Sequence, residues 1–484
     1  MMITQFMTTK QLGNLSRQRM RNIERKYHKK LHSLQRRIKR SNLPVRFNNT
    51  TVTAFGNFGL FQAFKEAIDF RGMLGQIHLK RHHNCLYTNV ALLDTTIDAL
   101  TLGLLRFSHM NGLRTDPGYQ KIKETTQIAD ESTLREILAV ICEQKALDRL
   151  AEINRTLLSL KARTDEPREV WLDIDDSVLT VFGNQEGAKK GYNPRYHGRL
   201  SYKVKVAFIS GTCELVNARL YSGNVASNGQ FMEFLKETLD ILAAQNIIVK
   251  GIRMDKGFFA QDTFTYLEEQ CIDYICKAKL TSTMRKVINY LDEEEQWEPV
   301  SKNYATAEIT IPLPTWPKAR RFVFVRETEK PEIIDGQLCF DIETYDYEII
   351  VTSKDDLTAE KVWHEYNKRC NIENKIDELK VGLGFDKMSQ SKMGKNIAFM
   401  WLKVIAYNLL NWFRLALFED KESRYEVPTI RRKILNVPGN IVGNNRYRHV
   451  RLAPNPWLEK ILRVAKENLA VFFSYQAWLA VDTS

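Results

Sequence analysis

Four side chains near the carboxyl end of the sequence could act together if the stretch from Trp363 to Lys380 is a helix. The stretch has no proline or glycine, and its apolar residues recur at steps of three and four. At about 100° per residue, four polar residues fall within an arc of roughly 60° on one face: Tyr366, Arg369, Glu373 and Lys380. These side chains can form ordinary surface ion pairs, such as Arg369 with Glu373. Alternatively, they contribute one acid to a site whose other acids lie elsewhere in the chain.

Further acids follow two apolar runs that we expect to be strands. The run Glu169–Ile174 leads into a group of three aspartates: Asp173, Asp175 and Asp176. The two-residue period of a strand puts the first two on one face and the third on the other. Asp255 comes directly after the apolar run Ile247–Met254 and before a predicted helix. Ligand sites form at the ends of strands in α/β sheets, although Asp255 could instead cap the helix or begin a turn.

Four stretches occur in an order that resembles the group 1 DDE transposases of bacterial insertion sequences: LDIDDSV, GNQEGAKKGYNPRYHGRLSY, RMDKGFF and YNKRCNIENKIDELK. The resemblance covers roughly residues 50 to 465, and the last stretch fills every position of the family signature Tyr-x2-Arg-x3-Glu-x6-Lys. By motif position, it implies a catalytic triad of Asp175, Asp255 and Glu373. Asp175 lies two residues before a hydroxyl residue, here Ser177 where the family often has Thr. Asp173 is the alternative first acid.

The resemblance implies phosphoryl transfer with two divalent metal ions. The three carboxylates would supply hard oxygen ligands for two Mg²⁺ ions, and Mn²⁺ should substitute. One ion would lower the pKa of an attacking water, and the other would stabilise the leaving oxygen. Three clustered carboxylates repel one another, so we expect the metal-free site to be strained or partly protonated.

The same resemblance assigns DNA contacts. It implies that Arg369 and Lys380 hold phosphates near the cut, and that Tyr366 hydrogen-bonds a phosphate or stacks on a base. Four basic residues in the glycine-rich stretch after the first strand form either a DNA-contacting loop or a solvated hairpin: Lys189, Lys190, Arg195 and Arg199. Related enzymes hold a flipped base with an aromatic residue in the region of Trp297 and Trp316, but a tryptophan is more often part of a core.

Composition favours a globular protein that binds a polyanion. The chain has 484 residues, 44% hydrophobic and 27% charged, with a formal net charge of +13. Residues 17–40 carry eleven Lys or Arg and one acid, so this segment alone holds +10. This charge indicates a DNA-contacting helix within residues 10–40, or alternatively a basic tail or a targeting segment. Seven cysteines without a C-x2-C pair indicate a reducing compartment and no structural zinc site.

We expect an α/β fold: an RNase H-like mixed-sheet catalytic core interrupted by a β-rich insertion, with a helical N-terminal region. The RNase H-like element is implied by the resemblance, and alternating strand and helix patterns support the α/β class. The predicted segments are a basic arm (1–45), a helical DNA-binding region (46–165), the first part of the core (166–280), the insertion (281–352), the second part of the core (353–420) and a basic, helical C-terminal region (421–484).

The function implied by this resemblance is cut-and-paste DNA transposition, with cleavage at transposon ends and strand transfer into target DNA. The expected partner is double-stranded DNA, at the terminal inverted repeats and at the target, bound by a homodimer. A metal-dependent nuclease without strand transfer is one alternative. A catalytically inactive or domesticated DNA-binding protein is another, and a basic RNA-binding scaffold is a third. The chain has no apolar run of 18 residues and no secretory signal, so we expect no membrane span and a bacterial cytoplasmic, nucleoid-associated protein.

Overall fold

The computed structural model describes residues 17–41, 51–160, 168–316, 318–328, 333–334, 337–338, 345–419, 421–444 and 447–482. The chain forms two compact units, Met1–Thr50 and Thr51–Ser484. In the first unit, helix α2 (Arg17–Ser41) confirms the predicted basic helix from residue 17 onward. Residues 10–16 of that prediction lie outside the residues that the structure describes. Within the described residues, no helix combines the length and apolar character that a membrane crossing requires.

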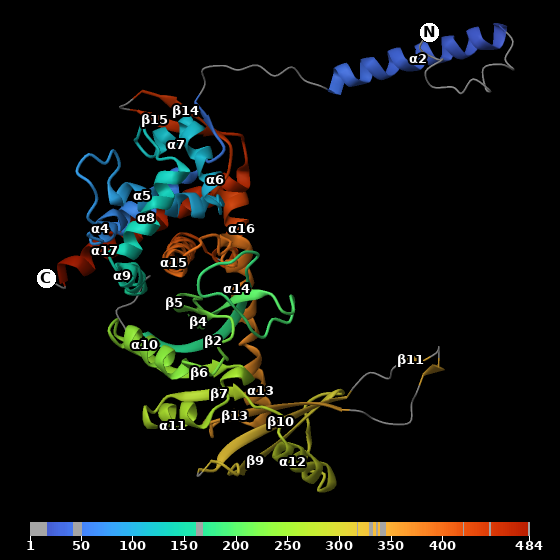
Figure 1. Cartoon of the computed structure of the whole chain (residues 1–484), viewed down its shortest axis with the longest axis vertical. Helices are drawn as coiled ribbons and strands as arrows, with labels where there is room; N and C mark the ends of the chain where they lie inside the picture. Colours follow the sequence, from blue (N-terminus) through green and yellow to red (C-terminus); the bar gives the residue numbers. More distant parts are fainter. Residues whose placement is uncertain are drawn as a thin grey trace. The chain divides into compact units, whose positions relative to one another are not determined.

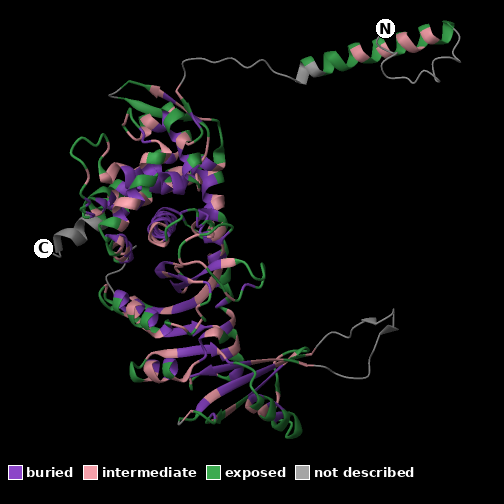
Figure 2. Cartoon of the chain, in the orientation of Figure 1, coloured by how far each residue is buried: buried purple, intermediate pink, exposed green. Residues whose placement is uncertain are grey.

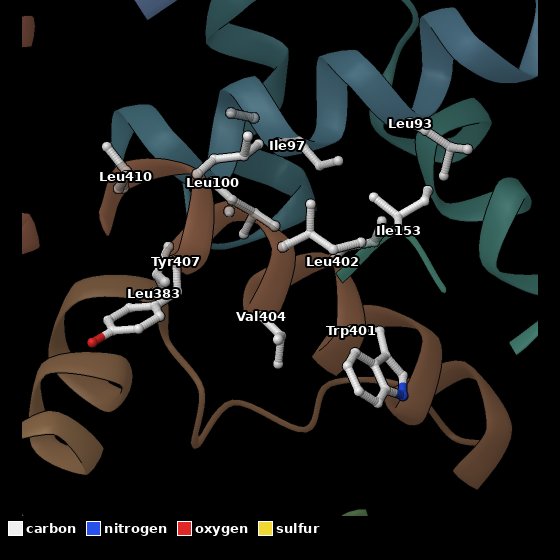
Figure 3. Close-up of a cluster of buried hydrophobic side chains, with 14 of the residues drawn as sticks. Leu93, Ile97, Leu100, Ile153, Leu383, Trp401, Leu402, Val404, Tyr407 and Leu410 are labelled. Carbon is white, nitrogen blue, oxygen red and sulfur yellow. The ribbon is translucent and has the colours of Figure 1, made fainter. Parts of the chain in front are cut away.

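The second unit begins with short helices that pack around one long, central helix. The central helix is α15 (Met393–Leu417), which is buried on nearly all sides. The helices of this region are α3 (Phe58–Ala67), α4 (Phe70–Gly75), α5 (Asn89–Leu102), α6 (Phe107–Met110), α7 (Pro117–Ile122), α8 (Glu131–Glu143) and α9 (Leu147–Leu158), and α5, α8 and α9 pack directly on α15. Figure 3 shows Leu402 of α15 among leucines and isoleucines of α5 and α9. A helix that is apolar all round requires such a shell.

The helical N-terminal region is therefore confirmed. Helical periodicity runs through Gly59–Gly75 and through Glu131–Ser159, and each pattern by itself predicts one long helix. The first stretch divides at Asp69, whose φ of 48° is left-handed and whose side chain caps α4. The second divides near Lys145, where φ is 52°. Periodicity continues across both breaks in the sequence, which is why the pattern alone did not reveal them.

The central sheet has the strand order of an RNase H-like core. Its strands are β2 (Arg168–Thr180), β4 (Leu200–Ile209), β5 (Leu215–Ser222), β6 (Ile247–Met254) and β7 (Asp273–Lys277). They lie in the order β5-β4-β2-β6-β7, with β5, β4 and β2 antiparallel and β2, β6 and β7 parallel. Helices α10 (Phe231–Ala243) and α11 (Gln261–Glu269) make the crossovers to β6 and β7. The mixed α/β class is thus confirmed (Figure 1).

The predicted β-rich insertion extends this sheet instead of forming a sheet of its own. It contains helix α12 (Ser282–Glu293) and strands β8 (Glu298–Pro299), β9 (Tyr304–Ile311), β10 (Arg320–Thr328) and β13 (Tyr345–Thr352), and the short pair β11 (Ile333–Ile334) and β12 (Gln337–Leu338). Strand β13 pairs with β7, so the sheet continues as β7-β13-β10-β9-β8. Both tryptophans are packed: Trp316 lies 4.9 Å from the Phe259 ring, and Trp297 stacks beneath Arg326.

The chain then returns to the core and ends on the helical region. Helices α13 (Ala359–Asn367) and α14 (Cys370–Leu383) lead into α15, followed by α16 (Val427–Ile430), the π-helical turn Arg431–Leu435 and α17 (Pro456–Asp482). Strands β1 (Val52–Thr53), β14 (Gly439–Gly443) and β15 (Arg448–Leu452) form a small separate sheet. The buried Arg431 guanidinium donates to the carbonyl oxygens of Leu100, Thr101 and Gly382, so it ties α5 to α14.

Candidate active site

Two of the predicted acids lie on neighbouring parallel strands. In the register of β2 and β6, Ile174 is opposite Met254, so Asp175 and Asp255 follow at the same level. Adjacent strands are about 4.8 Å apart, which brings these two carboxylates to the same edge of the sheet. Asp176 points to the opposite face, as predicted, where its carboxylate lies 3.2 Å from the Lys203 ammonium.

Asp173, the alternative first acid, is already engaged in a structural ion pair. Its carboxylate accepts two hydrogen bonds from Arg253 of β6, at 2.6 Å and 3.0 Å. Both side chains are buried, and the same guanidinium donates to the Ser210 hydroxyl and the Glu365 carbonyl. Because Asp173 is committed to Arg253, this geometry favours Asp175 as the first acid of the site. Sequence reasoning missed Arg253, although a buried arginine in an otherwise apolar strand signals an acidic partner.

The backbone of Asp255 begins a short 3₁₀ turn, Lys256–Phe258, through the hydrogen bond from Phe258 N to Asp255 O at 2.9 Å. Its side chain makes no capping hydrogen bond. Of the two alternative roles for Asp255, the start of a turn is observed for its backbone, whereas its carboxylate caps no helix. That group stays half-buried beside Asp175.

The predicted helix Trp363–Lys380 is wrong as a single helix, because α13 ends at Asn367 and α14 begins at Cys370. Hydrogen bonds of the i→i−3 type replace the α-helical ladder between them, as in Arg369 N to Tyr366 O at 2.9 Å. The tighter turn changes the rotation between the two segments. The predicted stripe is consequently split between the interior and the surface of the protein.

Tyr366 and Arg369 are each 5% exposed, whereas the Glu373 side chain is 63% exposed. Tyr366 packs in a cluster with Ile275 and Val323, so its ring faces the protein interior. Lys380 is partly exposed and lies 3.4 Å from Asp377. Of the four signature residues, Glu373 and Lys380 thus reach the surface that DNA could contact.

Arg369 connects the third predicted acid to the first. Its guanidinium lies 2.8 Å from Asp175 and 3.4 Å from Glu373. The i,i+4 ion pair with Glu373 that the sequence offered as an alternative is present, but it is one half of a bridge between α14 and β2. The positive charge lies among acids that would otherwise repel one another.

Burial raises the pKa of Asp175 to about 7, and the neighbouring carboxylates of Asp176 and Asp255 add to this effect. The Arg369 guanidinium and the backbone N–H of Asp176 oppose it without cancelling it. Burial also raises the pKa of Tyr366. The site therefore contains a carboxylate that is only partly ionised at neutral pH, a property common at functional sites.

The donor set fits a hard cation, although it is not preassembled. Among the residues that the structure describes, no three His, Cys, Asp or Glu side chains are grouped closely enough to hold a metal ion. Asp175, Asp255 and Glu373 nevertheless offer only carboxylate oxygens, the ligands that Mg²⁺ and Mn²⁺ prefer. Arg369 shows that a cation is accommodated between the first and third of these acids.

The predicted basic loop lies on the surface. Lys189 and Lys190 form the short strand β3, which pairs with the start of β4, and Arg195 and Arg199 follow in the connecting turn. All four side chains are exposed. The loop is also anchored, because Glu186 N donates to the carbonyl of Ser391, beyond the end of α14, at 2.8 Å.

Comparisons with known proteins give the family. No curated protein matches the chain. Among solved structures, it is similar to the piggyBac transposase in a synaptic complex with hairpin DNA, with 12% identity, 88% of each chain covered and a TM-score of 0.40. The family model described as "Transposase DDE domain group 1" matches residues 35–472. The chain therefore belongs to the group 1 family of DDE-domain transposases.

Proposed function

We propose that this protein cleaves DNA at the ends of a transposable element and joins those ends to target DNA in a cut-and-paste reaction. Its family supports DNA transposition as the process. The observation that carries the finer proposal is the placement of Asp175 and Asp255 side by side at the ends of parallel strands, with Glu373 joined to Asp175 through Arg369. We assign these three acids as the catalytic and metal-binding residues.

DDE transposases generally use divalent metals, and we propose two Mg²⁺ ions here, replaceable by Mn²⁺. When bound, they would activate the attacking hydroxyl and stabilise the charge that develops on the leaving oxygen. Asp175 and Asp255 would hold them from the sheet and Glu373 from α14. Because Asp175 has a raised pKa, it must lose its proton before it can act as a ligand.

Arg369 would maintain the site before the reaction. Its guanidinium neutralises Asp175 and Glu373, so the carboxylates stay together without a bound ion. When metal ions bind, Arg369 would release the carboxylates of Asp175 and Glu373 or share them with the ions. Lys380 on α14 and the basic loop around Lys189 would hold the phosphates of double-stranded DNA on either side of Glu373.

The proposed partners are the inverted repeats of the element and a target duplex, held by two copies of the chain, because two ends must be joined in one event. From the insertion-sequence resemblance, we propose that this activity takes place in a bacterial cytoplasm, at the nucleoid. Detection of strand transfer would distinguish a transposase from a nuclease that only cuts DNA. Detection of metal-dependent cutting would distinguish it from a catalytically inactive DNA-binding protein.

The test is cleavage and joining of a labelled duplex that carries the end of the element, with Mg²⁺, Mn²⁺ or EDTA. Glu373→Gln should reduce cleavage at least about a thousandfold, because a ligand to a metal that supplies several kcal/mol is lost. DNA binding should persist. Asp377→Asn is the matched control: it lies one turn along the same helix with a side chain 74% exposed, and it should cut normally. Equal activity of Glu373→Gln and wild type would refute the assignment, and cutting without joined products would favour the nuclease.

A further inference from the structure

The connection between β2 and β4 exposes three aromatic side chains. Phe182 is 71% exposed, Tyr192 is 77% exposed and Tyr196 is 40% exposed. We call the segment Phe182–Arg199 the aromatic loop; it projects beside α14 in Figure 1 and is mostly exposed in Figure 2. Single exposed apolar residues are common on proteins, but several exposed rings within one short segment mark an interaction surface.

The aromatic loop is also strongly basic. It contains the exposed residues Lys189, Lys190, Arg195 and Arg199, and Glu186 is its one acid. Two cations flank a pair of rings: the Arg199 guanidinium lies 5.8 Å from the Phe182 ring, and that of Arg195 lies 5.8 Å from the Tyr196 ring. The rings of Phe182 and Tyr196 meet edge to face at 5.6 Å. Exposed rings with cations beside them match a single strand of nucleic acid, whose bases can stack while its phosphates pair with the cations.

The loop is held in shape by its own polar contacts. The buried Asn193 donates to the Thr180 hydroxyl at 2.9 Å and accepts from the backbone N–H groups of Arg195 and Tyr196. On its other side, Gln185 donates to the Met388 carbonyl at 3.2 Å. The rings are therefore presented from a fixed backbone, which lowers the entropy cost of binding.

The loop lies close to the candidate active site. A Cβ atom on Gly191 would come within 1.9 Å of the Gly223 carbonyl oxygen, so the two backbones are in direct contact. The loop that begins at Gly223 continues to Ser227, which lies 2.8 Å from the position of a Cβ on Gly257. Gly257 is two residues after Asp255. The aromatic loop is thus connected to the segment that carries Asp255 through the residues Gly223–Ser227.

We propose that the aromatic loop binds unpaired bases of the DNA strand next to the cleavage site. Bases would stack on Phe182, Tyr192 and Tyr196, while the four cations contact the adjacent phosphates. This inference rests on the proposed function and adds a preference for DNA whose end is opened. A protein partner is less well matched, because the rings are interleaved with like charges instead of forming a continuous apolar face.

The test compares two DNA probes of the same sequence in EDTA, where no cleavage occurs. One is a fully paired duplex, and the other is a fork with unpaired arms that carry 2-aminopurine. Wild type should bind the fork more tightly and quench its fluorescence by stacking. The double variant Phe182→Ala/Tyr192→Ala should weaken fork binding at least fivefold, since each base–aromatic stack contributes about 5- to 150-fold. Duplex binding should change less than twofold.

Two variants control this comparison. Tyr192→Phe keeps a stacking ring and should bind the fork as wild type does. Tyr290→Ala removes a ring that is 50% exposed near the acidic end of α12, where the run Asp292–Glu295 begins, and should have no effect. All the substituted side chains are exposed, so thermal unfolding should match wild type.

Unchanged fork binding in the double variant would overturn the inference, as would an equal loss on fork and duplex. A change in self-association of the DNA-free protein without a change in DNA binding would also overturn it, in favour of an interface between copies. Binding in EDTA is independent of catalysis. A failure of this inference is therefore distinguishable from a failure of the proposed function, which is read from metal-dependent cutting by wild type and Glu373→Gln.

Discussion

Replacement of Asp175 by asparagine should stabilise the metal-free protein. The pKa of this carboxyl rises from its ordinary value of 3.8 to about 7 in the folded protein because its side chain is 15% exposed. A group with a raised folded pKa binds its proton more tightly in the folded state, so stability falls as the pH rises from about 4 to 7. Each pKa unit is worth about 1.36 kcal/mol. The burial of Asp175 should therefore cost about 4 kcal/mol at pH 8, where the folded protein holds it ionised, and about 1.6 kcal/mol at pH 5, where the folded protein holds it protonated.

Asparagine has the same shape but no charge to bury, and its oxygen can still accept from Arg369. The free energy of unfolding of Asp175→Asn in EDTA should exceed that of wild type by about 2–4 kcal/mol at pH 8, with a smaller difference at pH 5. Urea unfolding followed by fluorescence measures it, with Trp171 on the same strand as a probe. Added Mg²⁺ should reduce or reverse this difference in unfolding free energy, because only wild type retains the Asp175 ligand. A ligand present at 100 times its Kd stabilises the protein that binds it by about 2.7 kcal/mol.

Glu373→Gln is the matched control, because it changes a carboxylate in the same site that is 63% exposed. Its stability in EDTA should stay within about 0.5 kcal/mol of wild type at both pH values. The reasoning is refuted if Asp175→Asn is less stable than wild type at pH 8. That result would make Asp175 and Arg369 a stabilising structural ion pair and not a strained site awaiting a cation.

Three further predictions concern the metal, the helical region and the basic arm. Mn²⁺ should bind wild type about tenfold more tightly at pH 8 than at pH 6 by titration calorimetry, because the proton on Asp175 competes below pH 7; equal affinities would contradict this. Arg431→Met should lower stability by about 2–4 kcal/mol, since it removes a buried donor group that serves three carbonyl oxygens, whereas the exposed neighbour change Arg432→Met should have little effect. Deletion of residues 1–41 should reduce the salt dependence of duplex binding by roughly 0.9 in slope for each phosphate that the basic helix neutralises in the intact protein; an unchanged slope would show that α2 does not touch DNA.

Much of the fold could be predicted from the sequence because its strands carry strong local signals. The apolar run Ile247–Met254 is observed as β6 with the same bounds, and the alternation around Asp175 correctly separated it from Asp176. The breaks at Asp69 and Lys145 were not predictable in this way, because each depends on one residue in a left-handed conformation that periodicity does not register. The extension of the core sheet through β13 was also missed, since strand pairing over long sequence separations is a tertiary property.

The candidate site was predictable in its residue types but not in its electrostatics. The spacing located Glu373 and Arg369 on one face, but the tight turn at Lys368 buries Arg369 against β2. A buried guanidinium needs a partner, and the nearest carboxylate is on a strand almost 200 positions earlier. The choice between Asp173 and Asp175 likewise depended on Arg253, a neighbour that only the folded sheet supplies.

The measurement that tests the central claim most directly is the position of a bound divalent ion on the protein itself. Fe²⁺ in place of Mg²⁺, with ascorbate and peroxide, generates hydroxyl radicals that cut the backbone beside the metal ligands. The account predicts cuts at three places far apart in the sequence, near residues 175, 255 and 373, all suppressed by excess Mg²⁺ and absent in Asp255→Asn. Cuts at other positions that Mg²⁺ suppresses, or cuts near these residues that persist in Asp255→Asn, would contradict it.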